Sequence, residues 1–174
     1  QHAISTNRCL LLSPTGSGKS LIIYSLVRYY QNLIEDDRKI LIIVPTTSLV
    51  TQMYNDFKDY SQSNEWDVRV NCHKIYGGQD KVCDQQIVIS TKIMTKLKDC
   101  PYRIGTTGTL DGTLTHKLVI EGLFGSVYNV TSTKDLIDKD LLSKLKIDSI
   151  LLSYDDNTKK EIKKANYQDE MDWI

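Results

Sequence analysis

The chain has 174 residues, of which 40% are hydrophobic and 25% are charged, and this composition is typical of one globular domain with a sizeable core. Lysine and arginine number 22, as do aspartate and glutamate, so the balance excludes an overall positive field and any contact with nucleic acid must be local. The longest apolar runs are far too short to span a membrane and no signal-peptide pattern is present, so we expect a cytoplasmic protein without membrane contact.

The first residue is Gln1 rather than methionine, so we expect a fragment of a longer protein. None of the 4 cysteines forms a C-x-x-C pair, which favours reduced thiols over disulfides. Cys72 and His73 are adjacent, but no second pair of ligands follows at a matching spacing, and we expect no metal site there.

The first predicted elements are a buried strand at residues 10–12 and a helix at residues 21–34, joined by a glycine-containing loop. In such a loop the glycines let backbone N–H groups point at an anion, and the N-terminus of the helix adds a favourable dipole. The loop matches G-x-x-x-x-G-K-[ST], except that Ser13 stands where the first glycine should be. It predicts a triphosphate site in which Lys19 binds phosphates and the Ser20 hydroxyl binds Mg²⁺. The residues expected to bind the nucleotide are Pro14, Thr15, Gly16, Ser17, Gly18, Lys19 and Ser20.

Strand and helix signals alternate over the next part of the chain. Residues 39–44 are apolar and β-branched and are followed by Pro45, which predicts a strand buried on both faces. Thr46 or Thr47 can cap the following helix, whose apolar stripe is Leu49, Met53, Phe57 and Tyr60. Further strands are predicted at residues 68–76, 87–89 and 102–107, and a further helix at residues 92–97.

Beyond residue 110 the alternation becomes less regular. A helix is predicted at residues 115–121, a turn at 122–125, a second helix at 135–144 and a strand at 145–154. Residues 157–174 are charged and poorly periodic. We therefore expect one domain at residues 1–125, followed at 126–174 by a linker or the start of a second domain.

Repeated β-α-β signals predict an α/β fold, in which helices cover both faces of a parallel sheet. In such folds ligands bind at the carboxyl ends of the strands. Polar loops follow four of the predicted strands, at residues 13–20, 45–47, 90–91 and 107–109. We expect these loops to form one functional rim.

These loops contain blocks that resemble the motifs of superfamily 2 helicases of the DEAD/DEAH type, in the same order. The blocks read Ser-Pro-Thr-Gly-Ser-Gly-Lys-Ser, Ile-Val-Pro-Thr-Thr-Ser-Leu-Val-Thr-Gln-Met, Gly-Gly, Val-Ile-Ser-Thr and Thr-Gly-Thr-Leu. Leu97-Lys98-Asp99-Cys100 and Phe124-Gly125 add a similarity to the UvsW-type group of T-even phages. The resemblance implies a RecA-like P-loop NTPase domain that uses ATP and Mg²⁺.

The resemblance also implies a role for individual residues. Thr107 and Thr109 match the motif that couples hydrolysis to strand movement, in which Gly108 replaces the usual alanine, and with Lys19 they form the implied catalytic set. The residues that match DNA-backbone motifs are Pro45, Thr46, Thr47, Gln52, Gly77, Gly78 and Thr91. Threonine hydroxyls and exposed glycine amides suit phosphodiester contacts that carry no sequence information.

One motif of this superfamily is missing. Its Asp-Glu-x-His/Asp block should follow an apolar strand between residues 90 and 104, but no such block is present. A parallel crossover needs about a dozen residues, so the interval holds one crossover and not two with a strand between them. We expect that a segment has dropped out near residues 90–92. Asp169-Glu170-Met171-Asp172 spells a similar block but follows a polar stretch, and we interpret it as the start of a helix.

The resemblance implies the first lobe of an ATP-dependent DNA helicase that remodels branched DNA in recombination, replication and repair. A second RecA-like domain of the same parent chain would be its partner, so this chain alone should bind ATP weakly and hydrolyse it poorly. Two alternatives stay open: another P-loop enzyme such as a small-molecule kinase, and a non-catalytic module that binds nucleic acid in a nucleotide-dependent way. Motifs that contact only the backbone do not distinguish DNA from RNA.

Overall fold

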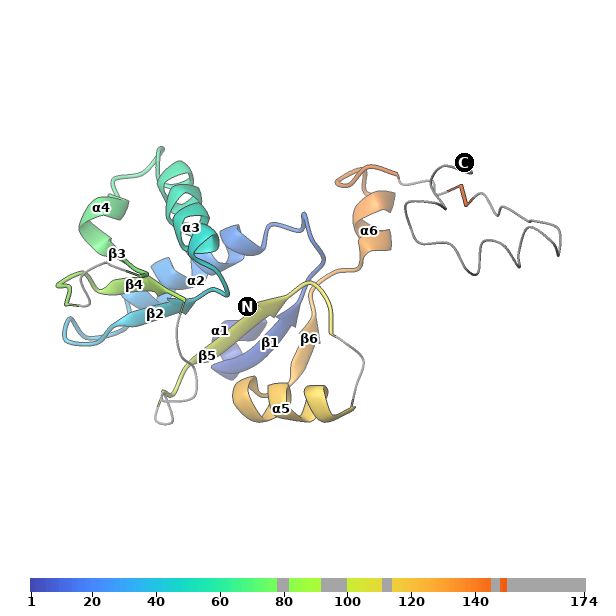
Figure 1. Cartoon of the computed structure of the whole chain (residues 1–174), viewed down its shortest axis with the longest axis horizontal. Helices are drawn as coiled ribbons and strands as arrows, with labels where there is room; N and C mark the ends of the chain where they lie inside the picture. The colour runs from blue at the N-terminus through green and yellow to red at the C-terminus, as the bar shows by residue number, and fades with distance from the viewer. Residues whose placement is uncertain (78–81, 92–99, 111–113, 145–147, 150–174) are drawn as a thin grey trace, which may run out of the picture. The chain divides into compact units, whose positions relative to one another are not determined.

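The computed structural model describes residues 1–77, 82–91, 100–110, 114–144 and 148–149 (Figure 1). The chain divides into two compact units, Gln1–Leu142 and Ser143–Ile174, and every helix and strand named below belongs to the first. Among the described residues, no helix combines the length and apolar character needed to cross a bilayer.

The first unit contains two parallel sheets, each of three described strands. In the first sheet β1 (Arg8–Leu12) lies between β5 (Arg103–Thr107) and β6 (Val127–Asn129). The strands of the second sheet, in spatial order, are β2 (Ile40–Ile43), β4 (Ile87–Ser90) and β3 (Cys72–Ile75). Every one of these strand pairs is parallel, which confirms the predicted α/β class.

Six helices accompany these strands in the described part of the chain. They are α1 (His2–Thr6), α2 (Lys19–Gln31), α3 (Thr47–Tyr60), α4 (Val68–Asn71), α5 (Leu114–Phe124) and α6 (Thr133–Asp138).

Helices cover both faces of the first sheet. Successive side chains of a strand point to opposite faces, and β1 uses both. On one face, α2 packs on β1 through a small apolar cluster that contains Cys9, Leu11, Ile22 and Leu26. On the other face, Leu10 and the α5 residue Phe124 both lie close to Gly105, and Figure 1 shows α5 below the sheet.

The larger hydrophobic core lies where α2 and α3 cover the second sheet. Tyr24 and Val27 of α2 contribute to it, so α2 packs on both sheets. Phe57 of α3 is fully buried, with its ring 5.3 Å from that of Tyr24 and 6.4 Å from that of Trp66. The apolar stripe predicted for this helix therefore faces the core as expected.

Two strand predictions were wrong in part. Residues 68–71 form α4 rather than strand, because the Asp67 carboxylate accepts the Arg69 backbone N–H and caps a helical turn. The alternation that suggested a strand contains Val70, which is 69% exposed. Residues 40–43 do form a strand, but Leu41 is 39% exposed, since β2 lies at an edge of its described sheet instead of being buried on both faces.

The part after residue 110 also differs from the predictions. Helix α5 continues to Phe124, where a turn had been predicted, and ends as the Gly125 N–H donates to the Glu121 carbonyl. The next predicted helix is the shorter α6, which starts at a capping box between Ser132 and Asp135. Neither β6 nor α1 was predicted.

The first unit runs past the expected domain boundary at residue 125, because β6 pairs with β1 and the unit ends at Leu142. The assignment of the remainder to a linker or a second domain stays a prediction. The predicted helix at residues 92–97 and the segment 157–174 lie outside the described residues, as does most of the predicted strand at 145–154. The loss of a segment near residues 90–92 stays a prediction, because the described residues stop at 91 and resume at 100.

Candidate active site

The loop between β1 and α2 has the backbone geometry of an anion site. Gly16 and Gly18 adopt φ angles of 82° and 80°, in the left-handed region that favours glycine. Gly18 is the N-cap of α2 and supplies no side-chain cap. Within the described chain, the N–H groups of Gly16, Gly18, Lys19 and Ser20 donate to no carbonyl. Unpaired N–H groups at the positive end of a helix are the arrangement that binds phosphate.

Lys19 folds back over this loop. Its Nζ donates to the carbonyls of Pro14, at 2.8 Å, and Ser13, at 3.1 Å. An ammonium held by two neutral carbonyls can exchange them for phosphate oxygens, because hydrogen bonds to a charged acceptor are about twice as strong. The loop thus keeps a cation next to its own unpaired amides.

Ser13, at the position where the motif has its first glycine, is accommodated without strain. It is fully buried and is not among the described residues with positive φ. Its Oγ lies 2.5 Å from the Ser17 Oγ, which in turn donates to the Pro14 carbonyl at 2.6 Å. The buried Ser13 side chain therefore stabilises the loop through its hydrogen bond to Ser17.

The Ser20 hydroxyl, predicted to bind Mg²⁺, lies in the first turn of α2 and faces α3. Its Oγ is 2.7 Å from the hydroxyl of Tyr60, the last residue of α3. A hydroxyl beside Lys19 and the unpaired amides fits a cation that arrives with phosphate oxygens. In the described part of the chain no group of three or more His, Cys, Asp or Glu side chains could hold a metal ion, and Ser20 stays the predicted protein ligand.

The loop after β5 lies beside the loop of residues 13–18 between β1 and α2, which is called the phosphate loop below. The register pairs Leu12 with Thr107, and the Ser13 N–H donates to the Thr107 carbonyl at 2.9 Å. The Thr107 hydroxyl donates to the Thr109 carbonyl, also at 2.9 Å. The structure therefore brings residues 107–109 next to the phosphate loop, through the pairing of neighbouring parallel strands.

Gly108, which replaces the alanine of the matching motif, has room for a methyl group. A Cβ there would lie 3.7 Å from the Ser13 carbonyl oxygen and 3.7 Å from the Thr15 Oγ1, which is ordinary contact. We predict that Gly108→Ala changes ATP affinity less than about 2-fold and does not lower the free energy of unfolding, since alanine also restricts the unfolded chain. Isothermal titration and urea unfolding test this. A loss of binding would show that the loop needs a glycine there.

The residues predicted to contact DNA follow the strands of the second sheet. β2, β3 and β4 are parallel, with Ile43 and Ile75 both in register with Ser90, so the segments after them leave one edge. Most of the predicted residues are exposed and Thr91 is half-buried, whereas Gly78 lies outside the described residues. The exposed ones are Pro45, Thr46, Thr47, Gln52 and Gly77.

The structure does not place these residues against the phosphate loop. Thr46 is the N-cap of α3, whereas Ser20 contacts Tyr60 at the opposite end of that helix. A helix of 14 residues is about 20 Å long. The predicted rim therefore consists of two groups, one at the phosphate loop and one about a helix length away.

Thr46 is also used structurally. Its Oγ1 accepts the Leu49 N–H at 3.3 Å and lies 2.9 Å from the Ser48 Oγ. Capping of α3 accounts for this threonine without any ligand. Thr47 and Gln52, on the exposed first turns of α3, have no such structural use among the described contacts.

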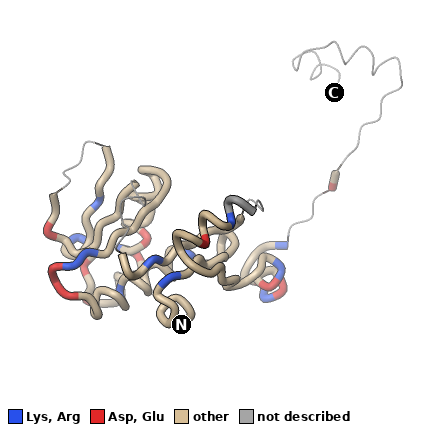
Figure 2. Tube along the Cα trace, turned by 90° about the horizontal axis from the view of Figure 1, so that it is seen from below, with Lys and Arg blue, Asp and Glu red and all other residues tan. Residues whose placement is uncertain are grey.

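Within the described ranges, charge and thiol chemistry point to no further site. Figure 2 shows short stretches of Lys and Arg and of Asp and Glu distributed along the described chain. Burial raises the pKa of the Cys72 thiol to about 12, so this thiol is protonated at neutral pH and is a poor metal ligand.

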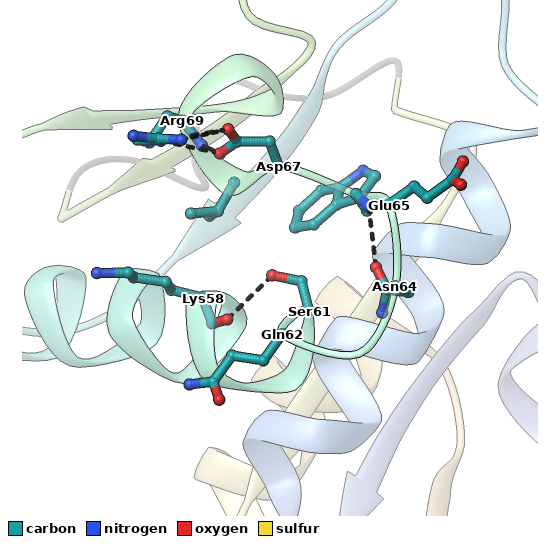
Figure 3. A pocket seen from close by; sticks show the side chains of 9 residues that line it. Lys58, Ser61, Gln62, Asn64, Glu65, Asp67 and Arg69 are labelled. Carbon is teal, nitrogen blue, oxygen red and sulfur yellow. Dashed lines mark hydrogen bonds and ion pairs between the residues drawn. The ribbon is translucent and has the colours of Figure 1, made fainter.

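A shallow hollow lies after the end of α3 (Figure 3). Its charged residues are partly paired with each other, as Arg69 and Asp67 form a salt bridge at 2.8 Å. Residues of the phosphate loop do not line it, so it is separate from the candidate nucleotide site.

Tyr60 and Leu142 belong to the site although they had not been predicted in it. Tyr60 had been assigned only to the apolar stripe of α3. Leu142 follows α6, and its Cδ2 would lie 2.8 Å from a Cβ at Gly16. Both contacts join residues 40 or more positions apart, and no local pattern in the sequence signals them.

Comparison with known proteins gives a consistent set of relatives. Residues 1–128 match the family model described as DEAD/DEAH box helicase. The chain is 31% identical to the ATP-dependent DNA helicase uvsW of Enterobacteria phage T4 over 98% of its own length, and covers 40% of that protein. It is also 34% identical to DEAD-box ATP-dependent RNA helicase 45 of Oryza sativa subsp. japonica over a stretch of 80 residues. That stretch covers 43% of this chain and 8% of the rice protein.

Solved structures agree with the fold. The crystal structure of T4 UvsW matches with a TM-score of 0.60 and 30% identity, over 99% of this chain and 39% of that one. The Hef helicase domain of Pyrococcus furiosus matches with a TM-score of 0.55 and 14% identity, over 75% of this chain and 38% of that one, which supports the fold alone. The stretch matched to the phage helicase has 206 positions against 174 residues here, so at least 32 of its positions have no counterpart in this chain.

Proposed function

Because the chain belongs to the DEAD/DEAH box helicase family, we propose that it is the first motor lobe of an ATP-dependent DNA helicase or translocase that remodels branched DNA in recombination, replication and repair. The chain spans about 40% of the phage helicase that it matches, so the activity proposed is that of a longer protein.

The proposal is supported above all by the geometry of the phosphate loop and by the position of residues 107–109 beside it. Left-handed glycines, unpaired amides and Lys19 converge at the N-terminus of α2, and residues 107–109 lie directly beside them. This arrangement can bind a triphosphate and can transmit its presence to a loop of the adjacent strand.

The proposed mechanism begins with the exchange of partners at Lys19. The β- and γ-phosphates replace the Pro14 and Ser13 carbonyls as acceptors and also take the free amides of the loop. Ser20 would hold Mg²⁺, which neutralises phosphate charge when bound. The Ser13 N–H donates a hydrogen bond to the Thr107 carbonyl, and the Thr107 hydroxyl donates to the Thr109 carbonyl. Movement of the phosphate loop would therefore displace Thr107 and Thr109.

Nucleic acid would bind at the second group of residues. Pro45, Thr47, Gln52 and Gly77 are exposed polar or backbone-presenting positions near the carboxyl edge of the second sheet, suited to a sugar-phosphate backbone. Similarity to a protein named a DNA helicase over almost the whole chain favours DNA, whereas similarity to a rice RNA helicase covers 43% of it. RNA is therefore the alternative ligand.

We propose that this chain alone is catalytically incomplete. Phosphoryl transfer in P-loop NTPases needs an acidic residue at a strand end for Mg²⁺, and the described residues offer no acidic metal cluster. The unmatched positions of the phage helicase are numerous enough to hold a strand and its crossover. A second RecA-like lobe of the same parent chain, working in the bacterial cytoplasm, would complete the motor.

The test is ATP turnover by the 174-residue chain and by a longer protein that contains it, each with single-stranded DNA, forked DNA or RNA. We expect turnover stimulated by DNA in the longer protein and negligible turnover in the isolated chain. Turnover that nucleic acid does not affect would favour a different P-loop enzyme. Binding of DNA without turnover in the longer protein would favour a non-catalytic module.

A further inference from the structure

The Ser20 hydroxyl has a partner that the phosphate-binding motif does not account for. Tyr60 lies 40 residues further along the chain, at the end of a different helix, and its Oη is 2.7 Å from the Ser20 Oγ. The distance is that of a good O–H···O hydrogen bond. The bond connects the proposed metal ligand directly to the helix that starts at residue 47.

The Tyr60 side chain is held in place from several sides. Its ring packs on the larger core and lies 5.6 Å from the ring of Tyr24. The Tyr24 hydroxyl accepts hydrogen bonds from Arg28 and Asn64, and the Asn64 amide also donates to the Tyr60 carbonyl. These contacts hold the ring and the backbone of Tyr60 in place, and they thereby keep its hydroxyl next to the Ser20 Oγ.

The chemistry of the two hydroxyls gives the bond a direction when a cation is present. A serine hydroxyl has one proton and two lone pairs, and a cation takes a lone pair. The proton must then point elsewhere and needs an acceptor. Tyr60 Oη can accept it, whereas an apolar neighbour would leave the proton without a partner in a half-buried place.

Resting on the proposed function, we infer that Tyr60 is a positioning residue for Mg²⁺–ATP: its hydroxyl accepts the Ser20 proton and thereby turns a Ser20 lone pair toward the cation. Among the described hydrogen bonds, the side-chain partner of the Ser20 Oγ is Tyr60 and not a carboxylate. Tyr60 thus orients the metal ligand without touching phosphate or metal itself.

The experiment measures the affinity of the 174-residue chain for a fluorescent ATP analogue in Mg²⁺ and in EDTA. The ratio of the two affinities, called here the Mg²⁺ factor, isolates the metal-dependent part of binding. Tyr60→Phe keeps the ring and removes only the hydroxyl. We expect it to lower the Mg²⁺ factor about 3- to 10-fold while the affinity in EDTA stays unchanged.

Two further variants complete the design. Tyr54→Phe removes another hydroxyl from α3, one whose ring lies under the Lys74 ammonium, and should leave the Mg²⁺ factor unaltered. Ser20→Ala should lower the factor by itself, and adding Tyr60→Phe to Ser20→Ala should lower it no further, since coupled partners are non-additive. Thermal unfolding of each variant reports any change in folding.

The outcomes separate the two proposals. A reduced Mg²⁺ factor in Tyr60→Phe that disappears in the Ser20→Ala background supports the inference. Equal losses in Mg²⁺ and EDTA, an unchanged factor, or an effect that persists without Ser20 overturns it while the proposed function stands. If the unmodified chain binds the analogue in neither buffer, the proposed nucleotide site fails and the inference fails with it.

Discussion

Replacing Lys19 by alanine is expected to weaken ATP binding by about 10- to 100-fold. The reason is the loss of charge-assisted hydrogen bonds to phosphate, each worth about 1.5–3 kcal/mol, and about 1.4 kcal/mol is a factor of ten. Lys19 already lies at the loop, donating to two of its carbonyls, so it needs little rearrangement to reach a phosphate. Titration with a fluorescent ATP analogue measures the effect.

The matched control is Lys117→Ala. Lys117 is an exposed residue of α5 that forms a 3.8 Å ion pair with Glu121, and its loss should leave ATP binding unchanged. If the Lys19→Ala chain and the unmodified chain bound the ATP analogue equally well, the phosphate loop would not be the nucleotide site. A parallel loss in both variants would indicate a general effect of charge instead.

The largest effect on stability is expected from Phe57→Ala, at about 3–5 kcal/mol of the free energy of unfolding. Phe57 is fully buried between α2, α3 and the second sheet, and two aromatic rings pack against it. Alanine would leave a cavity that these large neighbours cannot close without moving. Urea unfolding followed by circular dichroism measures the loss.

Leu33→Ala provides the comparison for that substitution. Leu33 is 61% exposed just after α2, so its truncation should cost less than about 0.5 kcal/mol. If Phe57→Ala costs as little as Leu33→Ala, the larger core is not packed as described. The contrast between the two variants is more informative than either value alone.

Local patterns predicted much of the fold. Apolar β-branched runs gave β2 and β4 to within one residue at each end, and the end of β1 was predicted correctly at Leu12. The helix predicted at residues 21–34 is α2, which starts two residues earlier and ends three residues earlier. Thr46 or Thr47 was expected to cap α3, and the cap is Thr46. These features depend on neighbours in the sequence, which is why the sequence is enough to predict them.

Other features depend on contacts that local patterns do not contain. Residues 127–129 form a strand of only three residues with two exposed side chains, and it is held by pairing with β1 and by stacking of the Tyr128 ring on His2. Val68 and Val70 alternate like a strand, yet the carboxylate of Asp67 directs this stretch into a helical turn. Tyr60 had every property of a core residue, and its hydrogen bond to Ser20 follows from how two helices cross.

Helix α2 presents its first turn to the proposed phosphate site and its sides to both hydrophobic clusters. A ligand that binds there adds its binding free energy to the element that joins the two halves of the core. Saturation with ATP should therefore slow the amide hydrogen exchange of β1 and β4 together, although these strands belong to different sheets and neither touches the ligand.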